Sequence, residues 1–172
     1  MADALESKLR KYLAYVWLRP ETVMFQTLKS KSLDSIAFDS PSLDISCGEG
    51  SFLFQHLGGE FEFPYDQHLE TRAAEFSHDK FIDIIDGDTD IKPPIKKKPD
   101  QLIDFGTDWK QKLLDKSARL GIYKNLILHD NNHLPLPFET ESLKTVFSNS
   151  LYWVPDIEAI MADIARILRP DG

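Results

Sequence analysis

The sequence has 172 residues, one cysteine and a formal net charge of -8, with 42% hydrophobic and 28% charged residues. This balance is typical of a globular protein, and the single cysteine excludes a disulfide framework within the chain. The acidic charge disfavours nucleic-acid binding, since phosphate contacts need lysine and arginine. No apolar run approaches the ~20 residues that span a bilayer, and no signal-peptide pattern is present, so we expect a cytoplasmic protein without a membrane span.

The first forty residues predict two helices. Apolar residues recur at helical spacing from residue 4 to residue 17, and the run ends at Arg19-Pro20, where a second helix begins. We expect residues 1–40 to form a helical cap that packs on the main domain. The apolar residues of the first helix are Leu5, Leu9, Tyr12, Leu13, Val16 and Trp17. The residues that the second helix is expected to bury are Val23, Met24 and Leu28.

A glycine-rich turn follows a short apolar strand at residues 42–47. Gly48 and Gly50 form the turn, and a helix then begins near Phe52 and ends at Gly58-Gly59. Strand, glycine-rich turn and helix make up the opening unit of a doubly wound α/β fold. Cys47 is interpreted as a small packing residue within this unit.

Residues 59–100 interrupt the pattern and are expected to form a solvated insertion. An acidic run is followed by a basic, proline-rich run, and opposite charge blocks divided by prolines are typical of solvent-exposed excursions. The spaced aspartates lack the glycine and the distal glutamate of a calcium-binding loop, so no metal site is predicted. These aspartates are Asp83, Asp86, Asp88 and Asp90.

From residue 101 the α/β pattern returns. Strands are predicted at 101–108, 125–128 and 143–147. A helix over 109–120 joins the first two, and Pro155 is expected in the first turn of a last helix. The inward residues expected for the helix over 109–120 are Leu113, Leu114, Ala118 and Leu120. Those expected for the last helix are Ile157, Ile160, Met161, Ile164, Ile167 and Leu168.

Acidic residues lie at or near the carboxyl ends of three strands, at Asp44, Asp108 and Asp130. In an open parallel sheet, ligands bind at that edge, where the strand order reverses. A glycine turn lets the backbone approach a ligand closely, because no Cβ intrudes. One acid can accept hydrogen bonds from both ribose hydroxyls, and another can accept from the amino group of adenine. The pattern therefore indicates a site for an adenosine-containing ligand.

Four segments resemble the class I S-adenosylmethionine-dependent methyltransferases, in particular the methyltransferase-domain group that acts on small molecules. They are residues 43–50, 104–108, 129–138 and 145–172, the last reading TVFSNSLYWVPDIEAIMADIARILRPDG. The resemblance implies an α/β, Rossmann-like, three-layer α/β/α fold with a mostly parallel sheet. It also implies methyl transfer from S-adenosylmethionine to an unidentified small-molecule acceptor.

The resemblance assigns cofactor-binding roles position by position. The glycine-turn segment would cradle the methionine and ribose portions through Asp44, Ser46, Gly48 and Gly50. The other implied contacts are Asp108 at the ribose, Asp130 and Asn131 at the adenine, and Asn149 beneath the methyl group. The family usually has glycine where Ser46 stands. Candidates for a general base, by location only, are His133, Tyr152 and His129.

Several alternatives remain open beside this interpretation. Asp66, in the segment FEFPYDQHL, is a rival for the ribose acid. Asp108 is preferred because its ~20-residue distance from Asp130 fits one helix plus one strand. A dinucleotide site is disfavoured, since its fingerprint needs a third glycine where Leu53 stands. A catalytically inactive, methyltransferase-like binding module and an oxidoreductase are the competing functions on the same fold.

The length sharpens the predicted domain organisation. Residues 41–172 are predicted to form a cofactor-binding methyltransferase domain that carries the insertion 59–100. The resembled fold continues with three further strands after the RPDG ending, so we expect this segment to be the N-terminal half of the domain. We therefore expect a sheet that is incomplete in its C-terminal half. The strand at 143–147 would then be an apolar exposed edge, through which copies of the chain would self-associate.

Overall fold

The computed structural model describes residues 2–16, 19–62 and 94–172. Trp17, the rival acid Asp66 and the acidic run at 83–90 lie outside these described residues. The predicted domain boundary at residue 40 stays a prediction. The chain divides into two compact units, Met1–Ile36 with Ser51–Asp100 and Ala37–Gly50 with Gln101–Gly172.

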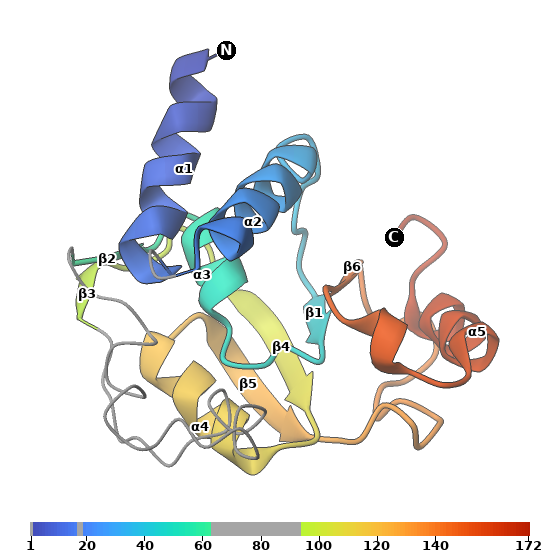
Figure 1. The fold of residues 1–172 in the computed structure, drawn as a ribbon. Helices are drawn as coiled ribbons and strands as arrows, with labels where there is room; N and C mark the ends of the chain where they lie inside the picture. The colour runs from blue at the N-terminus through green and yellow to red at the C-terminus, as the bar shows by residue number, and fades with distance from the viewer. Residues whose placement is uncertain (1, 17–18, 63–93) are drawn as a thin grey trace. The chain divides into compact units, whose positions relative to one another are not determined.

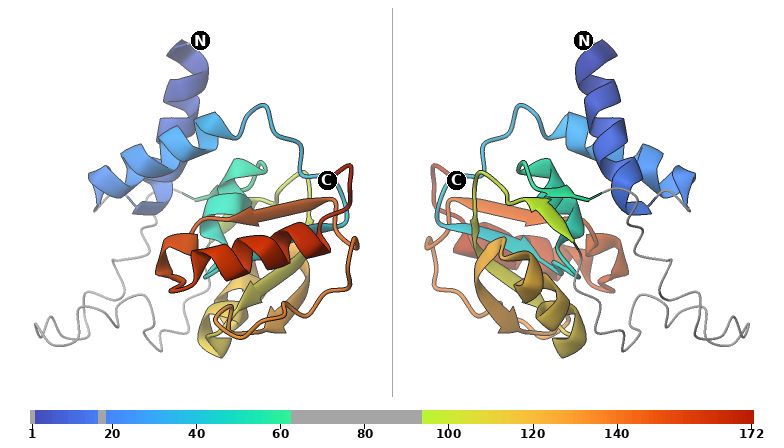
Figure 2. Two further views of the ribbon diagram at one scale, coloured as in Figure 1. Left: turned by 90° about the vertical axis from the view of Figure 1, so that its right-hand side faces the viewer. Right: turned by 90° about the vertical axis from the view of Figure 1, so that its left-hand side faces the viewer.

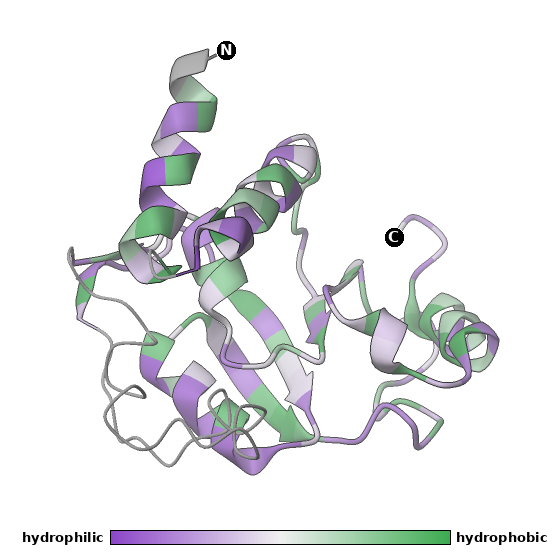
Figure 3. Cartoon of the chain, viewed as in Figure 1, coloured by the Kyte–Doolittle hydropathy of each residue, from purple (hydrophilic) through white to green (hydrophobic). Residues whose placement is uncertain are grey.

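The first unit contains both predicted N-terminal helices. α1 spans Ala2–Val16 and α2 spans Pro20–Ser32, and the two pack against each other (Figure 1). Hydrophobic and hydrophilic residues alternate along α1 (Figure 3), as expected for a helix with one buried face. Its buried side chains include Tyr12, Tyr15 and Val16.

The buried face of α2 differs from the predicted one. Val23 is buried as expected, but Met24 and Leu28 are 62% and 58% exposed. The buried residues of α2 are Val23, Thr27 and Ser30. Met24 directly follows Val23, and Leu28 directly follows Thr27. Each is therefore rotated by about 100° around the helix axis from a buried residue. Periodicity predicted the helix correctly, but not which of two neighbouring stripes faces inward.

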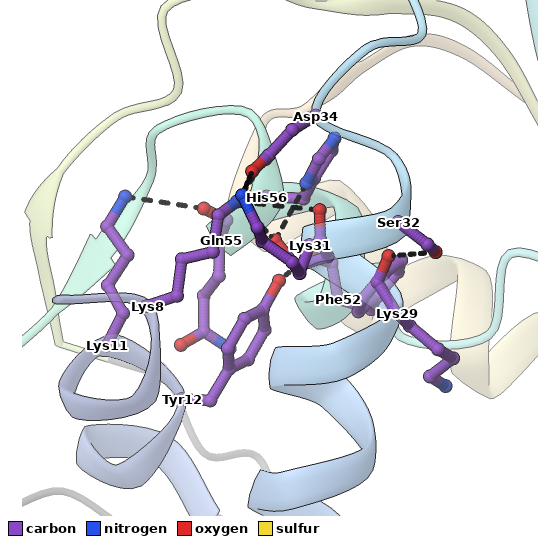
Figure 4. A network of polar contacts seen from close by, with 11 residues as sticks. Lys8, Lys11, Tyr12, Lys29, Lys31, Ser32, Asp34, Phe52, Gln55 and His56 are labelled. Atoms are coloured by element: carbon purple, nitrogen blue, oxygen red, sulfur yellow. Dashed lines mark hydrogen bonds and ion pairs between the residues drawn. The ribbon is translucent and has the colours of Figure 1, made fainter. Parts of the chain in front are cut away.

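Polar side chains connect the helices of the first unit (Figure 4). Lys8 Nζ donates to Ser30 Oγ at 2.8 Å and pairs with Asp34 Oδ1 at 2.6 Å. Ser30 Oγ lies 2.9 Å from Nδ1 of His56, at the end of α3 (Ser51–His56). Burial, together with the nearby Lys8 charge, lowers the pKa of His56. The imidazole is therefore neutral at pH 7 and joins α2 to α3 by a hydrogen bond.

A short antiparallel strand pair completes the described part of this unit. β2 (Glu60–Phe61) pairs with β3 (Ile95–Lys97), a pairing that the sequence did not predict. The Phe61 side chain is buried, and its ring lies 4.4 Å from that of Tyr15 and 4.7 Å from that of Phe54. Aromatic packing therefore ties β2 to α1 and α3.

The second unit is built on a parallel four-stranded sheet, as predicted. Its strands lie in the order β5-β4-β1-β6. The register places Asp44 beside Gly106 of β4 and Phe147 of β6. Strand order reverses at β1, because β4 and β5 extend the sheet on one side of it and β6 on the other. The strand bounds are Ser42–Ile45 for β1, Ile103–Asp108 for β4, Tyr123–Leu128 for β5 and Thr145–Ser148 for β6.

Helices cover both faces of this sheet. α5 (Ile157–Ile167) packs in one hydrophobic cluster with Leu43 and Ile45 of β1. α4 (Gln111–Leu120) contacts β4 and β5. In Figure 2, α5 lies in front of the sheet in one view and α4 lies in front in the opposite view. The predicted Rossmann-like, three-layer α/β/α fold is confirmed.

Helix boundaries and inward residues differ from the prediction in places. α5 begins at Ile157, two residues after Pro155. Asp156 caps the helix, since its side chain accepts a hydrogen bond from Ala159 N at 2.9 Å. In α4, Ser117 is buried. Three residues predicted to face inward are exposed: Ile157, Met161 and Ala118.

Among the strands that the structure describes, β6 lies at one end of the order, which is the position predicted for it. Self-association along that edge stays a prediction. Across the ranges that the structure describes, no helix combines the length and the apolar composition that crossing a membrane requires.

Asp104 joins the strands at the amino end of this sheet. Its carboxylate accepts hydrogen bonds from Lys124 Nζ at 2.7 Å, Ser40 Oγ at 2.6 Å and Ser42 N at 2.8 Å. Burial alone would raise the pKa of Asp104, but these donors outweigh it and hold the pKa at about 2. The ionised carboxylate thus connects β1, β4 and β5.

We expect Asp104→Asn to lower the free energy of unfolding by about 2 kcal/mol at pH 7, because a pKa held below its unfolded value stabilises the folded state. That stabilisation is complete above about pH 4 and is lost as the pH falls toward 2. Urea unfolding of both proteins across this range measures it. Asp115→Asn, on the exposed side of α4, is the control. A difference that persists unchanged at pH 2.5 would contradict the assignment.

Candidate functional site

A left-handed turn leaves the carboxyl end of β1. Ser46, Gly48 and Gly50 all have positive φ, at 56°, 58° and 78°. Ser46 adopts the conformation that glycine takes without strain, which explains why the resembled family has glycine there. Cys47 N donates to Thr107 O at 2.8 Å, and Gly50 N donates to Cys47 O at 3.0 Å. The turn is therefore fastened to the end of β4.

Asp108, the last residue of β4, forms a hydrogen bond with this turn. Its Oδ2 accepts from Gly48 N at 3.0 Å, and its Oδ1 accepts from Lys110 N at 2.9 Å. Asp108 is 4% exposed, and burial raises its pKa despite these backbone donors. A carboxylate has about four lone-pair sites, so Asp108 keeps acceptor capacity beside the hydrogen bonds from Gly48 N and Lys110 N.

Asp44 lies within β1, one residue before the strand ends. The hydroxyl of Tyr123 donates to Asp44 Oδ2 at 2.6 Å. Burial, with a smaller contribution from the charge of Asp108, raises the pKa of Asp44 to about 7, although the Tyr123 hydrogen bond acts in the opposite direction. Asp44 thus changes its charge near neutral pH.

The two predicted adenine-contacting residues have different surroundings. Asn131 Nδ2 donates to Ser46 Oγ at 2.5 Å, and Asn131 Oδ1 is buried with no hydrogen-bond partner among the described residues. Asp130 Oδ1 accepts from the backbone and side-chain nitrogens of Asn132, both at 2.9 Å. Asn131 therefore joins the glycine turn, whereas Asp130 stabilises the loop that follows β5.

The remaining predicted residues lie at the same edge of the sheet or on its loops. Asn149 directly follows β6, whose Ser148 pairs with Ile45. Tyr152 is 76% exposed in the short helix Leu151–Trp153. The exposed His133 lies 3.5 Å from Asp130, and His129 Nε2 is buried with no hydrogen-bond partner in the described part of the chain. A general-base role for any of these stays a prediction.

Ser117 and Tyr123 are among the residues at the site that were not predicted from the sequence. Ser117 Oγ of α4 donates to Gly48 O at 3.0 Å. Tyr123 reaches Asp44 from β5, which lies two strands away. One signal pointed to such a contact: Gly106 lies in the interior of β4, and a strand glycine often marks a close approach. The β5 strand was predicted to begin at residue 125, so Tyr123 fell outside it.

Comparison with known proteins gives a sequence match over part of the chain. Residues 103–172 match the model of the methyltransferase domain family. No curated protein matches the chain. The matched segment begins at β4 and includes Asp108, Asp130, Asn131 and Asn149.

Three solved structures with a similar fold carry the word methyltransferase in their names. A putative methyltransferase from Haloferax volcanii, in complex with a methyltransferase activator, is 18% identical, with a TM-score of 0.50, over 88% of this chain and 51% of its own. A possible histamine N-methyltransferase from Thermotoga maritima is 12% identical, with a TM-score of 0.49, over 84% of this chain and 47% of its own. An S-adenosylmethionine-dependent methyltransferase from Mesorhizobium loti is 16% identical, with a TM-score of 0.48, over 84% of this chain and 49% of its own.

The chain spans about half the length of these solved structures. At these identities the likeness concerns the fold. The predicted resemblance to methyltransferases is confirmed, over residues 103–172 in sequence and otherwise in fold.

We expect Gly50→Ala to destabilise the protein more than Gly121→Ala does. Both glycines have positive φ, but a Cβ at Gly50 would lie 2.9 Å from Tyr123 Cε2, whereas a Cβ at Gly121 meets nothing within 4 Å. Left-handed strain alone costs about 1–2 kcal/mol, and overpacking adds roughly 1–3 kcal/mol at Gly50. Urea unfolding of both variants measures the difference. Equal losses would show that the turn is not packed on Tyr123.

Proposed function

We propose that this chain binds S-adenosylmethionine at the carboxyl edge of its four-stranded sheet and takes part in the transfer of the methyl group to an acceptor. The observation that carries the proposal is the hydrogen bond from Gly48 N to Asp108 Oδ2 at 3.0 Å. It brings a glycine turn and a buried acid together beside β1, where the strand order reverses. That is where open α/β sheets bind nucleotide-like ligands.

The residues at this edge suit the chemistry of the adenosine portion. Asp108 would accept hydrogen bonds from the ribose hydroxyls. The buried Asn131 Oδ1, which has no hydrogen-bond partner among the described residues, offers an acceptor for the amino group of adenine. Asp130, beside Asn131 in sequence, would contribute to the same subsite.

The turn would hold the methionine and ribose portions. A Cβ at Gly48 would meet nothing within 4 Å, so this backbone position leaves space for a ligand. The residues proposed to contact these portions are Asp44, Ser46, Gly48 and Gly50, with Asn149 beneath the methyl group.

S-adenosylmethionine supplies a methyl group that is already activated on a sulfonium. The protein then has to align the acceptor and exclude water, and a strong general base is optional. We propose a small molecule as the acceptor, with His133 or Tyr152 available for proton transfer. A dinucleotide fits less well, since Leu53 stands where the third glycine of that fingerprint would be.

A catalytically inactive binding module is the second candidate. The observation that favours it is Ser46, whose side chain occupies a left-handed position where the resembled family has glycine. Methyl transfer from labelled S-adenosylmethionine to a panel of small-molecule acceptors separates the two candidates.

The binding proposal is tested by calorimetric titration with S-adenosylhomocysteine. We expect saturable binding that Asp108→Ala weakens by roughly 10–100-fold, because hydrogen bonds to a charged group contribute about 1.5–3 kcal/mol. Asp66→Ala is expected to weaken binding less, and Asp115→Ala on exposed α4 serves as the control. No heat at millimolar ligand with folded protein would overturn the proposal. The reverse ranking of Asp108 and Asp66 would show that the ribose acid is wrongly assigned.

A further inference from the structure

We propose that Tyr123 is a positioning residue of the cofactor site, which holds the Asp44 carboxyl and supports the glycine turn from within the fold. This inference rests on the proposed function, because it concerns the same site. Tyr123 does not belong to the set of residues that the family resemblance assigns to the cofactor.

The side chain of Tyr123 passes over β4 at Gly106 to reach β1. It begins on β5, and its hydroxyl reaches Asp44 on β1 at 2.6 Å, although β4 lies between these two strands. Gly106 makes this crossing possible, because a Cβ there would lie 2.9 Å from Tyr123 Cδ1. The absence of a side chain at Gly106 of β4 therefore leaves the space that the Tyr123 ring occupies.

The same ring supports the turn. A Cβ at Gly50 would lie 2.9 Å from Tyr123 Cε2 and 3.2 Å from Ser117 Oγ. Ser117 also donates to Gly48 O at 3.0 Å. Tyr123 and Ser117 thus hold the backbone of the turn in place through contacts at Gly50 and Gly48.

The hydrogen bond from Tyr123 also controls the charge of Asp44. Within the described part of the chain, the ionisable groups that face Asp44 are Tyr123 of β5, Asp108 of β4 and Cys47 of the turn. Burial raises the pKa of Tyr123 and of Cys47, so both stay protonated near pH 7. With only Asp108 as a charged neighbour in this set, Asp44 depends on the phenol for stabilisation of its carboxylate.

A pH series of S-adenosylhomocysteine titrations tests the inference on the whole chain. In the wild type, we expect affinity to fall as the pH drops through about 7, because protonation of Asp44 removes a negative charge from the proposed subsite for the methionine portion, which carries the ligand's ammonium group. Removing a hydrogen bond that lowers a pKa raises that pKa, so Tyr123→Phe shifts the fall to higher pH. At pH 7 the variant is expected to bind roughly tenfold more weakly.

Tyr12→Phe is the matched control, since Tyr12 is a buried tyrosine of the first unit whose hydroxyl donates to Phe52 O at 3.5 Å. It is expected to keep the wild-type pH profile. A Tyr123→Phe variant with unchanged affinity and an unchanged profile would overturn the positioning role and leave the proposed function standing. No binding by the folded wild type at any pH would overturn both.

A second comparison covers the case in which Tyr123→Phe alone fails to fold, because it leaves a buried carboxylate without its donor. Asp44→Asn removes that charge, and Tyr123→Phe is then made in the Asp44→Asn background. If Tyr123 acts through Asp44, the double variant binds as well as Asp44→Asn, and neither shows the fall near pH 7. A further tenfold loss in the double variant would contradict the inference.

Discussion

The glycine turn at the end of β1 is the constraint on which the second unit depends. β1 is buried between β4 and β6, and its chain leaves the sheet through residues of positive φ. The backbone groups of that turn are bonded to the end of β4 through Thr107 and Asp108 and to α4 through Ser117. A turn held from several elements presents a fixed backbone surface, and a fixed surface is what recognition of a ligand requires.

The two ends of the sheet shift the pKa of a buried aspartate in opposite directions. At the amino end, Asp104 has a lysine and several hydrogen-bond donors, and its pKa is held at about 2. At the carboxyl end, Asp44 has the phenol of Tyr123 and a second buried carboxyl, Asp108, and its pKa rises to about 7. The amino end is arranged for stability. At the carboxyl end, no cation of the described residues pairs with the buried Asp44. This suits a ligand that carries positive charge on a sulfonium and an ammonium group.

The sequence predicted the elements of this fold better than their contacts. The position of Asp108 beside the glycine turn follows from glycines and strand ends, and periodicity predicts the elements of the second unit in the order β1, β4, α4, β5, β6 and α5. The pair of β2 and β3 was not predicted. The inward faces of the helices were predicted less accurately, because the period of a pattern does not fix its phase, as the exposed Met24, Ala118 and Met161 demonstrate. The bond between Tyr123 and Asp44 spans 79 residues of sequence and depends on the space above Gly106, which only the folded structure reveals.

The central claim is that the carboxyl edge of the sheet is an S-adenosylmethionine site, and its most direct test is a titration of the ¹⁵N-labelled chain with S-adenosylhomocysteine followed by two-dimensional NMR. Saturable shifts are expected to be largest for the backbone amides of residues 46–50, 108–110 and 131. Shifts confined to the helices of residues 2–32, or no shifts at millimolar ligand, would contradict the claim.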